Sequence, residues 1–120
     1  MWDPENHYIR FVPGASFTDP SYHLPHFYDL FAMKADEADR SFWKSAAEAS
    51  RRYIALSAHP VTGLSPEYSE YNGRIRLIFR KQWEYYSDAY RVAENIALDH
   101  IWFGPHPEND DVRKHLWHGI

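Results

Sequence analysis

Residues 36–60 read DEADRSFWKSAAEASRRYIALSAHP, and this stretch decides the fold. Apolar and small side chains recur along it at three- and four-residue spacings, which places them on one face of an α-helix. Acidic residues at its start complement the helix dipole, and the residue before Pro60 is pushed out of the helical region. We therefore expect a long amphipathic helix with Arg51 and the other charged side chains mostly outside. Its predicted buried stripe is Phe42, Trp43, Ala46, Ala47, Ser50, Tyr53, Ile54 and Ser57.

Three more helices are predicted around this stretch. One begins at Ser21, which can cap it, and carries Pro25 in its first turn. Another begins near Ser87 and is stopped by Gly104-Pro105, and a weaker one covers residues 109–118. The predicted buried stripe of the helix that begins at Ser21 is Leu24, Phe27, Tyr28, Phe31 and Ala32. The stripe of the helix that begins near Ser87 is Ala89 or Tyr90, Val92, Ala93, Ile96, Ala97, His100 and Ile101.

The segments between the helices lack such a pattern. Prolines and Gly14 indicate an extended entry segment over residues 1–20, and glycines and prolines indicate a loop over 60–73. Residues 74–81 fit either a short strand or an irregular basic lid. The chain is therefore predicted to be all-α, built from helical hairpins with long loops.

The composition excludes several classes of protein. With 120 residues, 44% of them hydrophobic and 18% aromatic, the chain is expected to pack as at most one domain. Its net charge of -4 is spread over both halves, which argues against a nucleic-acid partner. The absence of cysteine excludes disulfides and thiol catalysis. Polar and turn residues follow Met1, and no apolar run reaches the ~18 residues of a membrane span, so we expect a cytoplasmic chain.

The histidines and serines do not form a familiar catalytic motif. His23 with His26, and His115 with His118, are spaced three apart, but neither pair has a His-Glu-x-x-His frame, so a structural role is favoured over a metal site. The sequence contains neither a Gly-x-Ser-x-Gly elbow nor a glycine-rich phosphate loop. Serine-hydrolase and nucleotide chemistry are therefore unsupported.

Asp19 is the strongest candidate for chemistry, because it stands at a loop-to-helix junction beside an aromatic-rich run. A carboxylate in that position can simply cap the helix, or it can act as a base that activates water. Asp88 and Arg91 are three residues apart at the start of a predicted helix and face the same side. An ordinary ion pair explains them as well as a binding role does.

Five blocks of the sequence carry a family resemblance. They are FTDPSYHLPHFYDLF at 17–31, DRSFWK at 39–44, AAEASR at 46–51, HPVTGLSPEY at 59–68 and SDAYRVAENIALD at 87–99. These blocks closely resemble glycoside hydrolase family 8, and their order and spacing resemble the branch that releases xylose from the reducing end of oligoxylans.

The resemblance implies part of an (α/α)6 barrel that hydrolyses β-1,4-xylo-oligosaccharides with inversion and without a cofactor. Such hydrolysis uses an acid carboxyl and a base carboxylate on opposite faces of the sugar. Asp19 matches the family's base. Tyr22 and His23, beside it, and Asp88 and Arg91, from the next hairpin, are expected to bind the sugar.

The resemblance also implies that residues 1–120 are a C-terminal piece of one catalytic domain. The family's acid is a glutamate far upstream, nothing in residues 1–18 matches its motif, and Glu5 is not a credible substitute. Residues 74–83 depart from the expected polar loop. The expected partners are xylo-oligosaccharide and the remaining part of the barrel. The alternative is a non-catalytic helical remnant that binds sugar weakly or associates with another chain.

Because a cut barrel leaves helix faces uncovered, we expect large apolar side chains to be exposed or half-exposed. The candidates are Trp43, Tyr53, Ile54, Val92 and Ile96.

Overall fold

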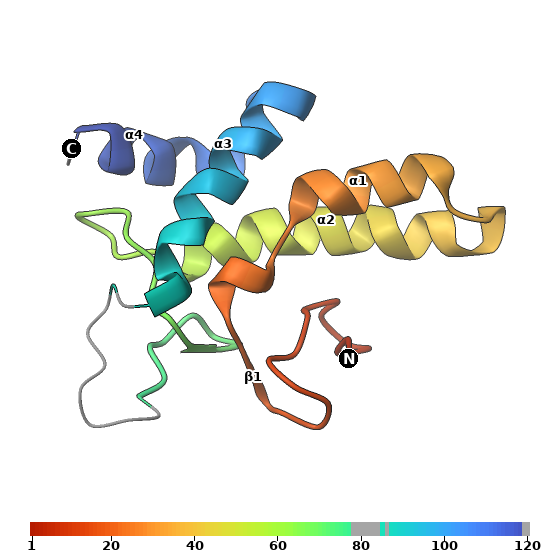
Figure 1. The fold of residues 1–120 in the computed structure, drawn as a ribbon, viewed down its shortest axis with the longest axis horizontal. Helices are drawn as coiled ribbons and strands as arrows, with labels where there is room; N and C mark the ends of the chain where they lie inside the picture. Colours follow the sequence, from red (N-terminus) through yellow and green to blue (C-terminus); the bar gives the residue numbers. More distant parts are fainter. Residues whose placement is uncertain (78–84, 86, 119–120) are drawn as a thin grey trace.

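The computed structural model describes residues 1–77, 85 and 87–118, and helices form most of its regular structure (Figure 1). Its elements are β1 (Phe17–Thr18), the 3-10 helix η1 (Pro20–Tyr22), α1 (Pro25–Lys34), α2 (Glu37–Ser57), β2 (Ser69–Glu70), the 3-10 helix η2 (Ser87–Tyr90), α3 (Arg91–Phe103), the 3-10 helix η3 (Pro107–Asn109) and α4 (Asp110–His118).

The four predicted helices are present, but two of them begin later than expected. The 3-10 helix η2 takes up residues 87–90, so α3 begins at Arg91 rather than near Ser87. The second difference is at the start of α1. A separate 3-10 turn, η1, takes up residues 20–22, so the α-helix begins at Pro25 rather than at Ser21. Proline at the first helical position loses no hydrogen bond that the helix needs. Ser21 therefore caps nothing in α1, and the cap of η1 is Asp19.

Helices α1 and α2 form a hairpin, and α3 lies at the end of the hairpin away from their connection, where it contacts α1 (Figure 1). Two apolar clusters hold these elements together. One joins α2, α3 and α4 through Ile54, Val92, Ile96 and Val112. The other joins α1, α2 and the N-terminal segment through Tyr28, Ala46, Ala47 and the partly buried Trp2, Leu24, Phe42 and Trp43.

A two-stranded antiparallel sheet connects distant loops. Phe17 in β1 lies opposite Glu70 in β2, and Thr18 lies opposite Ser69. Ile75 extends this pairing through an isolated bridge to Ser69. This bridge agrees with the short strand predicted as one alternative for residues 74–81, but only at that one residue. Residues 78–81 of that predicted segment lie outside the described residues. The sheet ends immediately before Asp19, so it brings the loop around residues 67–70 to that side chain.

Arg51 is buried, contrary to the expectation that it lies outside α2. Its guanidinium donates to both carboxylate oxygens of Asp99 in α3, at 2.9 and 2.6 Å. It also donates to Asp29 in α1. Because these charges are paired and hydrogen-bonded, their burial is tolerated, and one side chain links three helices.

The buried face of α3 differs from the predicted stripe. Val92 and Ile96 are buried as expected, but the other buried positions are Asn95 and Asp99. Ala93, Ala97 and Ile101 are exposed, because these two polar residues bond to η1 and to Arg51 and turn the helix toward them.

Four of the five large side chains that were expected to be exposed or half-exposed are buried. Tyr53, Ile54, Val92 and Ile96 are each at most 4% exposed, since α2, α3 and α4 cover one another there. Trp43 is half-buried. The exposed large apolar residues on α1 and α3 are Phe27, Phe31, Met33, Ile101 and Trp102. In the described part of the chain, none of the helices combines the length and hydrophobicity that crossing a membrane requires.

Candidate active site

Asp19 lies at the junction of β1 and η1 and is only 3% exposed. Its Oδ1 accepts a hydrogen bond of 2.8 Å from the backbone N–H of Ser21, so it caps the 3-10 turn. The backbone reinforces this turn, because the N–H of Tyr22 donates to the carbonyl of Asp19 at 3.0 Å. The capping role weighed from the sequence is therefore present, and it fixes where the carboxylate lies.

The environment raises the pKa of Asp19 to about 6. Burial is the main cause, and the neighbouring carboxylates of Asp88 and Glu67 raise the pKa further. The hydrogen bonds from Ser21 act in the opposite direction. A pKa close to neutrality is what a general base needs, because such a group can both accept and release a proton.

The structure brings three of the other predicted site residues close to Asp19. Burial raises the pKa of Tyr22, and the charges of Asp19 and Asp88 raise it further, while Arg91 lowers it. Arg91 also forms an ion pair with Asp88, at 3.2 Å between Nη1 and Oδ2, and both side chains are partly exposed. Asp19, Tyr22, Asp88 and Arg91 thus form one electrostatic group.

His23 is placed differently from these three, because it is fully buried. Its Nε2 lies 3.0 Å from Oγ1 of Thr18, and its Nδ1 lies 3.0 Å from Oγ of Ser50 in α2. Its ring also stacks on Tyr53, with the centroids 4.6 Å apart. Burial lowers the pKa of His23 to about 3, so it is neutral. His23 therefore supports the strand that leads to Asp19 and offers no free edge to a ligand.

Sequence reasoning missed Tyr68 as a member of this site. Its pKa is raised by burial and by the charges of Glu67, Asp19 and Asp88. Its ring meets Phe11 edge-on, with the centroids 4.7 Å apart. Phe11 in turn stacks on Tyr22. The available signal was its place in the block at 59–68, but only the sheet pairing brings that loop to Asp19.

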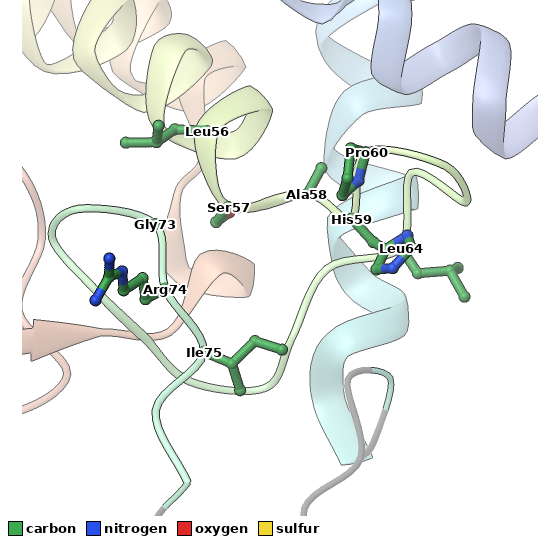
Figure 2. A pocket seen from close by; sticks show the side chains of 9 residues that line it. All are labelled: Leu56, Ser57, Ala58, His59, Pro60, Leu64, Gly73, Arg74 and Ile75. Carbon is green, nitrogen blue, oxygen red and sulfur yellow. The ribbon is translucent and has the colours of Figure 1, made fainter.

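A cavity of about 320 Å³ opens at the C-terminal end of α2, and its lining includes none of Asp19, Tyr22, Asp88 and Arg91 (Figure 2). Its lining is mostly apolar and includes no carboxylate, so it lacks the acid–base groups of the Asp19 site. It is lined by Leu56, Ser57, Ala58, His59, Pro60, Leu64, Gly73, Arg74 and Ile75. Among the described residues, no group of three or more potential ligands is arranged to hold a metal ion.

Replacing Asp19 with asparagine is expected to stabilise the folded chain at alkaline pH. The folded pKa of about 6 exceeds the ~3.9 of an unfolded aspartate, so the folded state binds the proton more tightly. The stability contributed by that proton is complete below about pH 4 and is lost as the pH rises through 6. Asparagine needs no proton and retains an oxygen for the Ser21 bond. We expect a gain of about 1–3 kcal/mol at pH 8 and little at pH 4, measured by urea unfolding. An equal gain at both pH values would contradict the raised pKa.

The chain shares extensive sequence with three known enzymes, although no protein-family model matches it. The reducing-end xylose-releasing exo-oligoxylanase Rex8A of Paenibacillus barcinonensis is 57% identical over 112 residues, which is 89% of this chain and 29% of the relative. The reducing-end xylose-releasing exo-oligoxylanase of Bifidobacterium adolescentis is 51% identical over 88% of this chain and 28% of its own length. That of Halalkalibacterium halodurans is 54% identical over 87% of this chain and 26% of its own length.

Solved structures agree with the sequence comparison. The structure of Rex8A complexed with xylose matches with a TM-score of 0.89 and 52% identity, covering 98% of this chain and 32% of that one. The Rex8A E70A mutant complexed with 3(3)-alpha-L-arabinofuranosyl-xylotetraose matches equally well.

Both comparisons cover only part of the relatives. The chain spans about 30% of the length of the exo-oligoxylanases it matches. The structural neighbours are (α/α)6 barrel enzymes, which confirms the predicted all-α class and the prediction that this chain forms part of such a barrel. The resemblance to glycoside hydrolase family 8 is thereby confirmed, and the chain is a relative of the reducing-end xylose-releasing exo-oligoxylanases.

Proposed function

We propose that residues 1–120 supply the base-bearing part of an inverting glycoside hydrolase that releases xylose from the reducing end of β-1,4-xylo-oligosaccharides. The observation that carries this proposal is the buried carboxylate of Asp19, whose pKa is raised to about 6. Asp19 also stands in the resembling block at 17–31, where it matches the family's base. The identity to three exo-oligoxylanases supports the substrate class.

In the proposed reaction, ionised Asp19 accepts a proton from a water molecule. The water oxygen forms a bond to the anomeric carbon as the bond to the glycosidic oxygen breaks on the opposite face. A carboxylic acid from another part of the barrel donates its proton to that leaving oxygen. Each turnover therefore adds one water across the bond and inverts the configuration at the anomeric carbon.

Tyr22, Asp88 and Arg91 are proposed to bind the sugar beside Asp19. Xylose residues present several hydroxyl groups, which need both donors and acceptors at short range. The ion pair of Asp88 and Arg91 offers both kinds of group and is partly exposed. The half-buried rings of Tyr22 and Tyr68 add apolar surface for the faces of the sugar.

The exposed aromatic face of α1 and α3 fits a position inside a larger barrel. Trp102 meets Phe27 edge-on, with the centroids 5.6 Å apart, and both side chains remain about 40% exposed. Large exposed apolar patches usually mark contact surfaces. We propose that residues 1–120 belong to one catalytic domain and that its other helices cover this face.

A chimera tests the proposed function. This chain would replace the matched segment of the Paenibacillus barcinonensis exo-oligoxylanase, which then supplies the rest of the barrel. We expect xylose to be released from xylotriose at a rate within about tenfold of that of the parent enzyme, because a tenfold change needs only ~1.4 kcal/mol in the barrier.

The parent enzyme and the same parent lacking the segment serve as controls. A chimera that unfolds cooperatively but releases no xylose would contradict the proposal. It would instead favour a non-catalytic helical remnant.

A further inference from the structure

Asn95 connects α3 to the turn that carries Asp19. It is 6% exposed, and its side-chain Nδ2 donates to the carbonyl oxygen of Ser21 at 3.0 Å. The same nitrogen donates to the carbonyl of His23 at 3.4 Å. These bonds cross more than 70 residues of sequence. Burying an amide without hydrogen-bond partners costs about 1–3 kcal/mol, and these two bonds spare Asn95 that cost.

The turn held by Asn95 is the one that holds the carboxylate of Asp19. Ser21 accepts from Asn95 through its carbonyl and donates through its N–H to Oδ1 of Asp19. The N–H of His23 closes the turn by donating to the carbonyl of Pro20 at 3.2 Å. A displacement of Ser21 relative to α3 would therefore move the carboxylate as well.

Helix α3 also carries the other charged part of the site. Arg91 lies one helical turn before Asn95, and Asp88 precedes it in η2. The bonds of Asn95 thus connect the Asp19 turn to the helix that bears the Asp88–Arg91 pair. Val92 and Ile96 of α3 pack against Ile54 of α2. This apolar packing does not depend on the side-chain amide of Asn95.

We propose that Asn95 is a positioning residue, which fixes the carboxylate of Asp19 relative to the Asp88–Arg91 pair through its bonds to Ser21 and His23. This inference rests on the proposed function, because it assigns Asp19 the role of base. Near-attack geometry tolerates only small displacements, so loosening this connection lowers the rate of the chemical step more than the affinity for the sugar.

The chimera described above provides the test. Asn95→Leu preserves much of the side-chain volume but cannot donate, and Asn95→Ala removes the amide without adding bulk. Ile96→Ala is the matched control, since Ile96 is the next residue and is equally buried. We expect both Asn95 variants to lower kcat for xylotriose at least tenfold with KM changed less than about threefold. We expect Ile96→Ala to change kcat less than threefold, even if it unfolds at a lower temperature.

A second measurement does not depend on activity. The pKa of Asp19 can be followed by carbon-13 NMR of aspartate-labelled chimera, with its signal assigned by its loss in Asp19→Asn. Burial raises the pKa of Asp19 and the hydrogen bonds from Ser21 lower it, and both depend on the turn, so releasing the turn should shift the pKa of Asp19 from about 6 by one unit or more in Asn95→Leu. Ile96→Ala should leave it within half a unit.

These outcomes separate the two proposals. If the unmodified chimera releases xylose but the Asn95 variants match Ile96→Ala in kcat and in the pKa of Asp19, the positioning role is wrong. If the folded chimera is inactive, the proposed function is wrong, and the titration alone decides whether Asn95 holds Asp19.

Discussion

Asp19→Asn in the chimera is expected to lower the rate of xylose release about 100- to 10,000-fold, the range in which a general base usually contributes. Asparagine preserves the shape of the side chain and can still accept from Ser21, but it cannot take a proton from water. KM for xylotriose should stay within about threefold, because the loss falls on the chemical step. Initial rates from a reducing-sugar assay measure both constants.

The acid side of the pH profile gives a further check on the same residue. Because Asp19 must be ionised and its pKa is about 6, kcat/KM of the unmodified chimera should fall below that pH. Asp36→Asn is the control, since Asp36 is exposed and makes no side-chain capping bond in α2. If the Asp19 variant keeps more than a tenth of the rate, a loss below ~1.4 kcal/mol, Asp19 is not the base.

The 120-residue chain by itself is expected to release no measurable xylose from xylotriose. Inverting hydrolysis needs an acid and a base on opposite faces of the sugar, and the resemblance assigns only the base to this chain. Loss of the acid removes a contribution of about 100-fold to 10,000-fold. Purified chain and chimera would be compared at equal concentration in the same assay.

That comparison requires the isolated chain to be folded, and circular dichroism at 222 nm shows whether it is. The four α-helices predict a strong helical signal. Turnover by the isolated chain that disappears in Asp19→Asn would show that a second carboxyl within these residues serves as the acid.

The periodicity of the sequence was enough to predict the helices, because apolar side chains recur along them at three- and four-residue spacings. It could not predict the buried face of α3, nor which polar residues are buried. Arg51, Asn95 and Asp99 are buried because each has a partner on another helix or turn. Such partners lie tens of residues away, so a local pattern counts these side chains as exposed.

The candidate site was predicted in part. Asp19 could be selected because it stands at a junction and within a resembling block, but its raised pKa depends on burial that only the assembled fold creates. Tyr68 reaches Asp19 through the β1–β2 pairing, which two-residue strands do not signal in a sequence. His23 lies next to the site along the chain, yet its ring points into the core.

The bridge made by Arg51 has a consequence for the order in which the chain folds. Its two carboxylate partners lie 22 and 48 residues away, and shorter loops close at a smaller entropic cost. The Asp29 contact is therefore expected to form with the early, local pairing of α1 with α2, and the Asp99 contact is expected to follow when α3 docks. Arg51 has a counter-ion at both stages, so the guanidinium is never buried without one along this route.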